Sequence, residues 1–169
     1  MKVWCYGDDV DTDQLFPGKY TYSCSTPEEI LPHLLEDLDP LFAGSVQPGD
    51  LIVAGKNFGC GSSREQPVLG LKAAGVTAII AKSFARIFYR ASINQGLLLI
   101  ESPQAVNAWN EGNIEEDAIT IDASEGLMTV GSRTFQVPPL PDMLLAIHEA
   151  GGLLQEVRNR LNEKKDGMR

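Results

Sequence analysis

The middle of the chain carries short, uninterrupted runs of apolar residues separated by longer segments of mixed polarity. Apolar runs of four or five residues without alternation are typical of strands in a parallel sheet that is covered on both faces. The segments between them are long enough for helical crossovers, which are right-handed in a parallel sheet. The three predicted strands are residues 51–54, 76–80 and 97–100.

Capping residues set the expected limits of the two helices between these strands. The first helix is expected to begin near Ser62 and to end at Gly75. The second is expected to begin at Ser83, whose hydroxyl can cap free backbone N–H groups, and to end near Gln95, before Gly96. The order strand, helix, strand, helix, strand predicts the core of an α/β fold.

The residues before this core predict a loop and then a helix. Residues 7–17 are rich in aspartate and predict an acidic loop. Thr26 then suits an N-cap, Pro27 the first helical position and Glu29 the reciprocal position of a capping box. The apolar residues expected on one face of this helix are Ile30, Leu34, Leu35 and Leu38.

The last third of the chain has shorter spacings. Three short strands separated by tight, glycine-containing turns predict antiparallel hairpins, and a cluster of prolines after residue 137 ends them. Helical segments are expected to about Leu161, with residues 162–169 as a mobile tail. The whole chain, residues 1–169, is therefore expected to be one α/β domain with a parallel central sheet, a smaller antiparallel sheet and flanking helices. The predicted antiparallel strands are residues 118–122, 127–130 and 134–137.

Composition and charge exclude several classes of protein. The chain has 169 residues, of which 43% are hydrophobic and 22% charged, as is ordinary for a globular domain with one core. No apolar run is long enough to cross a bilayer, and the first residues lack the apolar stretch of a signal peptide, which predicts a cytoplasmic protein. The formal net charge of -9 would repel a phosphate backbone and argues against binding nucleic acid.

The cysteines argue against a metal site in this chain. Cys5, Cys24 and Cys60 are odd in number and have no CxxC spacing, which fits neither a disulfide framework nor an autonomous zinc or iron–sulfur site. Only two histidines are present, so a histidine-based metal site is not expected either.

The most informative stretch is Asn57–Glu65, with the sequence NFGCGSSRE. Two glycines flank Cys60 and let the backbone turn sharply. The pattern Ser62-x-x-Glu65 predicts a capping box, and free N–H groups at a helix start favour an anion. Arg64 adds a guanidinium that can hold a carboxylate through two hydrogen bonds. The same pattern also fits a plain helix cap that binds nothing, and the residues alone leave both interpretations open.

Three ordered motifs resemble the swivelling domain of the aconitase family. They are residues 7–13, with Pro17 and Tyr20 after them, residues 55–65 and residues 80–90. The match covers most of the chain and is closest to the detached form of the domain, in which it is a separate small subunit. The resemblance implies a swivelling β/β/α fold and a hydro-lyase subunit that is active only with a large subunit.

The resemblance also implies a reaction and roles for particular residues. Family members dehydrate a 2-hydroxy acid and rehydrate the bound alkene in the other orientation, and their large subunit carries a 4Fe–4S cluster, so no cofactor is expected in this chain. By motif position, Ser62 is expected to be the base, Ser63 to add a hydrogen bond and Arg64 to hold a carboxylate. Asp13 is expected to orient partners in the assembled site, although an aspartate there also suits an ordinary turn.

The substrate is expected to contact the loop from Gly18 to Cys24, where the family's specificity loop falls. Tyr20 and Tyr22 are the candidate substrate-binding residues in it. Relatives that take tricarboxylates place an arginine at about the position of Tyr22, whereas the only cation here is Lys19. An aromatic side chain favours an alkyl-substituted malate, with isopropylmalate of leucine biosynthesis the commonest case. Dimethylmalate, methylmalate and homocitrate stay open as alternatives.

Two hypotheses come from other classes. A non-catalytic anion-binding module would use the same helix start and need no large subunit. An autonomous iron–sulfur or thiol enzyme would use the three cysteines, but Cys60 has no histidine near it in sequence, which favours a structural or subunit-facing role. Lys82, Ser83 and Arg86 belong to a family signature, and packing and capping are sufficient to explain them.

Overall fold

A four-stranded parallel sheet forms the centre of the computed structural model, which describes residues 1–112 and 119–166. Its strands lie in chain order, and the residues Val3, Leu51, Ala78 and Leu98 are in register across it. The three predicted strands and their parallel arrangement are confirmed, and residues 3–5 supply a fourth strand. The strands are β1 (Val3–Cys5), β2 (Leu51–Ala54), β3 (Ala78–Ala81) and β4 (Leu98–Glu101).

Alternate side chains of this sheet enter two separate cores. Ile52 and Ile79 belong to the core on one face, while Val53 and Ile80 belong to the core on the other. All four side chains are almost fully buried. Burying one such side chain contributes about 1.5–3 kcal/mol of hydrophobic free energy, so a sheet covered on both faces favours runs without polar residues.

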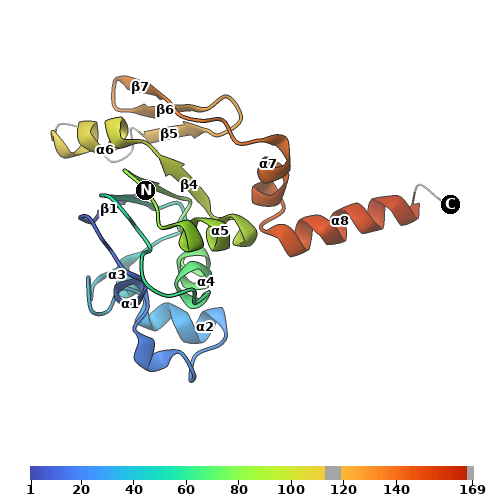
Figure 1. The fold of residues 1–169 in the computed structure, drawn as a ribbon, viewed down its shortest axis with the longest axis horizontal. Helices are drawn as coiled ribbons and strands as arrows, with labels where there is room; N and C mark the ends of the chain where they lie inside the picture. Colours follow the sequence, from blue (N-terminus) through green and yellow to red (C-terminus); the bar gives the residue numbers. More distant parts are fainter. Residues whose placement is uncertain (113–118, 167–169) are drawn as a thin grey trace.

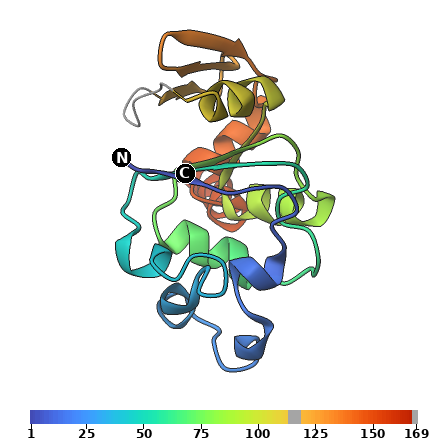
Figure 2. The same cartoon turned by 90° about the vertical axis from the view of Figure 1, so that its left-hand side faces the viewer.

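The sheet lies between two different layers (Figures 1 and 2). Short helices cover one face, and helix α6 with a three-stranded antiparallel sheet covers the other. The helices of the first layer are α1 (Thr12–Leu15), α2 (Pro27–Ile30), α3 (Phe42–Ser45), α4 (Gln66–Ala73) and α5 (Arg86–Gln95). The second layer contains α6 (Pro103–Asn110), β5 (Ile119–Asp122), β6 (Leu127–Val130) and β7 (Arg133–Gln136).

The antiparallel sheet confirms the predicted hairpins. Strand order is β5-β6-β7, with both pairs antiparallel, and β7 begins one residue before the predicted position. Residue 118, the predicted start of the first strand, lies outside the described residues. Two further helices follow, α7 (Asp142–Glu149) and α8 (Leu153–Asp166). Figure 1 shows α8 projecting from the rest of the molecule.

Helix α8 continues five residues past its predicted end near Leu161. Residues 162–166 are therefore helical where a mobile tail was predicted, and residues 167–169 lie outside the described part of the chain. No helix within the described ranges is both long and apolar enough to cross a membrane.

The first crossover helix begins four residues later than predicted. Helix α4 starts at Gln66, its N-cap is Glu65, and no side chain caps it. The predicted start at Ser62 is wrong because it would place Pro67 in the helix interior, where proline lacks the N–H for a hydrogen bond and its ring clashes with the preceding turn. With the observed start, Pro67 lies in the first turn, which tolerates it.

The second crossover helix is also shorter than predicted. Helix α5 begins at Arg86 after Ala85, and Ser83 does not cap it. The hydroxyl of Ser83 instead accepts a hydrogen bond of 2.8 Å from the backbone N–H of Asn57. The expected C-terminal end is confirmed, because Gly96 follows Gln95 in the left-handed conformation.

The capping box at Thr26 and Glu29 is confirmed, but the helix after it is a single turn. A 3-10 turn, η2 (Leu31–His33), follows because Pro32 has no N–H to continue the α-helical ladder. Leu35 then takes a positive φ of 55°. The four apolar residues predicted on one helical face still enter the core, Ile30 from the end of α2 and the three leucines from the irregular backbone that follows.

Three short helices had not been predicted: α1, α3 and α6. Helix α1 lies within the predicted acidic loop, where Asp11 and Gln14 form a capping box. Helix α6 begins with Ser102 as N-cap and Pro103 at its first position. Both signals were present in the sequence and would have located these two helices.

Candidate functional site

The candidate site lies at the carboxyl edge of the parallel sheet, where loops from neighbouring strands meet. We call residues 7–17, 55–65 and 82–85 the loop cluster. An isolated parallel bridge joins Asp11 to Cys60, and a second joins Phe58 to Phe84. These bridges extend the sheet pairing beyond the strands, at the edge where open parallel sheets place their ligands.

Two glycines allow the loops to approach this closely. A Cβ on Gly59, at φ +79°, would lie 2.1 Å from the ring of Phe88. A Cβ on Gly61, at φ +103°, would lie 2.9 Å from the hydroxyl oxygen of Thr12. Any side chain at Gly61 would therefore separate α1 from the residue that follows, Ser62.

The side chain of Ser62 is held by two groups from different parts of the loop cluster. Its Oγ lies 2.9 Å from Oγ1 of Thr12 and accepts a hydrogen bond of 2.8 Å from Nε of Arg64. The backbone N–H of Ser62 donates to the same Thr12 oxygen at 2.9 Å. The oxygen predicted to act as the base is thus surrounded by hydrogen-bonding groups, one of them charged.

The source of this stabilisation differs from the prediction. Ser62 was expected to lie at the N-terminus of a helix, but α4 begins at Gln66. The amides of that helix start are therefore not the groups that hold the hydroxyl. The contacts come from Thr12, from Arg64 Nε and, at 3.5 Å, from the backbone N–H of Arg64.

Arg64 connects Ser62 to the two preceding loops. Its Nη1 donates to Oγ1 of Thr21 at 2.9 Å and to the carbonyl of Phe16 at 3.4 Å, and its Nη2 donates to Asp13 at 2.5 Å. The Arg64 side chain is 16% exposed and that of Asp13 is 69% exposed. Asp13, predicted to orient partners, thus contacts the predicted carboxylate clamp directly, while Ser63 beside it is exposed.

The two tyrosines of the loop from Gly18 to Cys24 differ in exposure. The Tyr20 ring stacks on His33 with ring centroids 3.8 Å apart and packs against the core. A hydrogen bond from Lys19, followed by weaker ones from His33 and Tyr20, lowers the pKa of Glu36. Tyr22 is fully exposed. Tyr20 therefore anchors the loop, and Tyr22 is the tyrosine that the loop presents at the surface.

Two functional candidates, Thr12 and Thr21, were not assigned a role from the sequence. Thr12 lies inside the motif Asp11-Thr12-Asp13, and Thr21 lies between the two tyrosines. Their hydroxyls contact Ser62 and Arg64, which are distant in sequence. Only the packing of the loops brings these pairs together, so no local spacing identifies them.

The cysteines do not gather at one place. Cys5 lies at the end of β1, Cys24 is buried in the core and Cys60 lies in the loop cluster. Burial, followed by the charges of Asp11 and Asp9, raises the pKa of the Cys60 thiol. That direction is opposite to the one an activated thiolate needs. Within residues 1–112 and 119–166, no group of three metal-ligating side chains is present.

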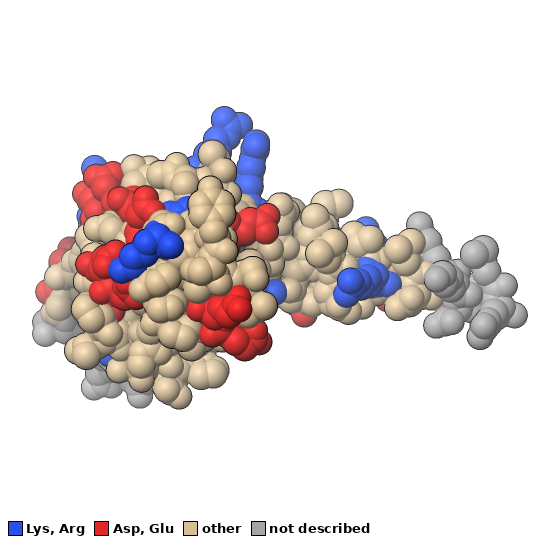
Figure 3. Space-filling view, turned by 90° about the horizontal axis from the view of Figure 1, so that it is seen from below, with Lys and Arg blue, Asp and Glu red and all other residues tan. Residues whose placement is uncertain are grey.

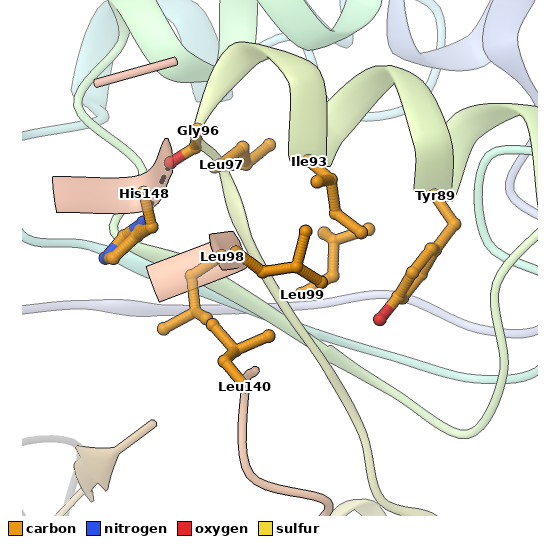
Figure 4. Close-up of a pocket in the computed structure, with 9 residues that line it drawn as sticks. Tyr89, Ile93, Gly96, Leu97, Leu98, Leu99, Leu140 and His148 are labelled. Carbon is orange, nitrogen blue, oxygen red and sulfur yellow. Dashed lines mark hydrogen bonds between the residues drawn. The ribbon is translucent and has the colours of Figure 1, made fainter. Parts of the chain in front are cut away.

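Two neighbouring hollows lie away from the loop cluster. Figure 4 shows one between α5, β4 and α7, lined mainly by apolar side chains, where His148 Nδ1 contacts the carbonyl of Gly96 at 2.8 Å. Its volume of about 10 Å³ holds at most one water molecule. A larger neighbour of about 350 Å³ lies between β4 and residues 137–141 and is also mainly apolar. Neither contains Ser62 or Arg64.

Acidic residues outnumber lysine and arginine in this chain, 23 to 14. Figure 3 shows them in several patches over the body of the molecule, with lysine and arginine interspersed. Arg64 is not part of a basic surface patch. Its side chain is mostly buried and donates hydrogen bonds to the polar groups of the loops around it.

Comparison with known proteins identifies relatives over nearly the whole chain. The model of the aconitase C-terminal domain matches residues 22–105. The small subunit of 3-isopropylmalate dehydratase from Heliobacterium modesticaldum is 47% identical over 167 residues, which cover 97% of each chain. The corresponding subunit from Moorella thermoacetica is 46% identical over 162 residues, covering 95% of each.

A solved structure agrees with these sequence relatives. The crystal structure of 3-isopropylmalate dehydratase from Methanocaldococcus jannaschii superposes with a TM-score of 0.83 at 37% identity, covering 98% of this chain and 96% of that one. The α/β fold with a parallel and an antiparallel sheet is thus shared with a relative. The chain therefore belongs to the aconitase-type family of 3-isopropylmalate dehydratase small subunits.

Proposed function

We propose that this chain is the small subunit of a hydro-lyase that interconverts 2-isopropylmalate and 3-isopropylmalate in leucine biosynthesis. The observation that carries the proposal is the Ser62 hydroxyl, held between Thr12 and the Arg64 guanidinium at the carboxyl edge of the sheet. Relatives named as small subunits of 3-isopropylmalate dehydratase match along nearly the full chain and support the substrate class.

In the proposed reaction, Ser62 acts as the base. Its alkoxide removes the proton from the carbon next to a substrate carboxylate, the electron pair forms the alkene, and the substrate hydroxyl departs. Return of water in the other orientation moves the hydroxyl to the neighbouring carbon. A serine oxygen is a weak base in water, and hydrogen bonds from fixed donors in a closed site make its anion accessible.

Arg64 and Asp13 have coupled roles in this proposal. The guanidinium holds the Ser62 oxygen through Nε and contacts the largely exposed Asp13 through Nη2. A substrate carboxylate would approach Arg64 beside Asp13, whose carboxylate now fixes the plane of the guanidinium. Ser63, the exposed residue that precedes Arg64, is proposed to add a hydrogen bond to substrate.

Two features of the loop from Gly18 to Cys24 support an alkyl-substituted malate. Its cation, Lys19, forms an ion pair of 2.5 Å with Glu36, so a third substrate carboxylate would have to compete with Glu36 for it. Its exposed tip is the aromatic ring of Tyr22. Homocitrate would bring an additional charge that needs a partner when it is buried, and the one cation of this loop, Lys19, is already paired with Glu36.

A large-subunit partner is part of the proposal. The loop cluster lies on an open edge of the sheet, and closure against a second protein would exclude water from Ser62. That partner is proposed to carry a 4Fe–4S cluster, which when bound acts as a Lewis acid on the departing hydroxyl. The complex is proposed to be cytoplasmic.

Reconstitution with the large subunit tests this function. The native pair should dehydrate isopropylmalate faster than dimethylmalate, methylmalate or homocitrate. Ser62→Ala should abolish turnover while the two subunits still assemble, as measured by gel filtration and a coupled absorbance assay. Ser132→Ala, at an exposed serine of the antiparallel sheet, is the matched control and should keep full activity.

Normal turnover by Ser62→Ala would remove the proposed base. Carboxylate binding by the isolated chain, with no activity in the pair, would favour an anion-binding module.

A further inference from the structure

Thr12 occupies a fixed position beside Ser62. It is the first residue of α1, and its side chain is buried at 2% exposure. Its N–H donates to the carbonyl of Cys60 at 2.8 Å, and its carbonyl accepts from the N–H of Phe16 at 3.0 Å. The capping box of Asp11 and Gln14 fixes the start of the same helix. The backbone of Thr12 is therefore held on both sides, which limits where its hydroxyl can move.

The Thr12 hydroxyl can serve Ser62 in two ways at once. Its oxygen accepts the hydrogen bond from the Ser62 N–H at 2.9 Å, which leaves its own proton for another acceptor. The nearest partner is Oγ of Ser62, also at 2.9 Å. When Ser62 is protonated, either hydroxyl can donate. When Ser62 is ionised, only Thr12 can donate, because the serine oxygen then has no proton.

The two groups that hold the Ser62 oxygen differ in their surroundings. Arg64 shares its charge with Asp13, Thr21 and Phe16, and Asp13 is largely exposed to solvent. Thr12 is buried, so water does not compete for its proton. A donor fixed in this way needs no reorganisation when charge develops on its acceptor.

We propose that Thr12 is a positioning residue that holds Ser62 Oγ and donates a hydrogen bond to its alkoxide. This inference rests on the proposed role of Ser62 as the base. Gly61 allows the Thr12 and Ser62 hydroxyls to lie this close together, because a Cβ at Gly61 would meet Oγ1 of Thr12 at 2.9 Å and force the two hydroxyls apart.

The test compares Thr12→Val with Thr12→Ser in the assembled two-subunit enzyme. Thr12→Val keeps the shape but removes the donor, and kcat should fall by about 10²-fold with little change in KM. The ascending limb of the kcat/KM profile, where activity increases with pH as the base loses its proton, should move to higher pH. The reason is that the pKa of Ser62 rises when its anion loses a hydrogen-bond donor. Thr12→Ser keeps a hydroxyl and should restore kcat and the pH profile to near native. Thr134→Val, on the exposed face of β7, is the matched control.

Each outcome decides between the proposals. A Thr12→Val enzyme with native kcat and pH profile overturns the inference, even if Ser62→Ala is inactive and the proposed function stands. Equal losses in Thr12→Val and Thr12→Ser, with a lower Tm and an unshifted pH profile, assign Thr12 a structural role only and also overturn it. If Ser62→Ala turns over normally, the base itself is wrong and both proposals fail together.

Discussion

The loop cluster and the antiparallel sheet use the same kinds of side chain to different ends. In the loop cluster, Thr12 and Ser62 place two hydroxyl oxygens 2.9 Å apart in a half-buried setting. On the antiparallel sheet, Thr129 and Thr134 place two hydroxyl oxygens 3.5 Å apart on neighbouring strands, one of them exposed. The second contact is open to water and adds little. The two regions do not differ in residue type. In the loop cluster, polar side chains from several loops meet and are shielded from water.

Two arginine–carboxylate pairs make the same point. The Arg133 side chain is 58% exposed and donates to Glu111, itself 64% exposed. The Arg64 side chain is 16% exposed, and every nitrogen of its guanidinium donates to a protein group. An exposed ion pair contributes about 0–1 kcal/mol of stability. A guanidinium whose nitrogens all donate to protein groups also fixes the positions of those groups.

The largest expected effect is at the apolar base of the loop cluster. Phe58 is fully buried, and its ring meets those of Phe84 and Phe88 at centroid distances of 6.3 and 5.5 Å. Phe58→Ala should lower the free energy of unfolding by about 3–5 kcal/mol, because it leaves a cavity where the loops cross. Urea unfolding of the isolated chain measures this loss.

The matched variant for that comparison is Phe135→Ala. Phe135 is only partly buried on β7, where it packs against the other core. Its replacement should cost less than half as much as Phe58→Ala, since less surface is removed from a less enclosed site. Equal costs for the two variants would mean that the loop cluster is no better packed than the antiparallel sheet.

The next effect concerns the guanidinium fork. Arg64→Lys keeps the charge but cannot contact Ser62, Thr21 and Asp13 together, so kcat of the assembled enzyme should fall by about 10²-fold. Arg133→Lys should leave kcat unchanged, because Arg133 makes one exposed ion pair far from the loop cluster. Steady-state kinetics on both variants, with assembly checked by gel filtration, separates the two regions. Near-native kcat in Arg64→Lys would show that charge alone is sufficient.

The same two regions show what could be predicted from the sequence. The antiparallel strands follow from short spacings and tight, glycine-containing turns, which are local signals, and they were located to within a residue or so. In the loop cluster, the residue types were predicted but their surroundings were not. Ser62 was placed at a helix start by a local pattern that Pro67 overrides.

The contacts that define the site are long-range in sequence. Thr12 and Ser62 are 50 residues apart, and Thr21 and Arg64 are 43 apart. Their meeting depends on how the loops after β1 and β2 cross, which no spacing within either loop encodes. The roles predicted for Ser62, Arg64 and Asp13 came from the family resemblance, and the contacts among them give those predictions a physical basis.

The smallest effect is expected at the opposite end of the parallel sheet, where a buried carboxylate has a structural role. Asp50 accepts hydrogen bonds from the backbone N–H groups of Lys2 and Gln47 and from the Trp4 indole, at 2.7, 3.0 and 3.1 Å. Burial alone would raise its pKa, but these donors hold the pKa below its usual 3.8. A lowered folded-state pKa contributes stability above pH 3.8, and that stability is lost as pH falls through the folded value.

Asp50→Asn tests this contrast with the loop cluster. An amide nitrogen would face at least one of the three N–H donors, so the variant should lose about 1–3 kcal/mol of unfolding free energy at neutral pH. The gap between native and variant should narrow as pH falls below 3.8, because only the native protein loses a charge-assisted network there. Urea unfolding at several pH values measures this gap, and activity of the assembled enzyme at neutral pH should stay within a few-fold of native. A difference in unfolding free energy that stays constant with pH would mean that the hydrogen bonds at Asp50 do not depend on its charge. A large loss of activity would mean that the two ends of the sheet are coupled.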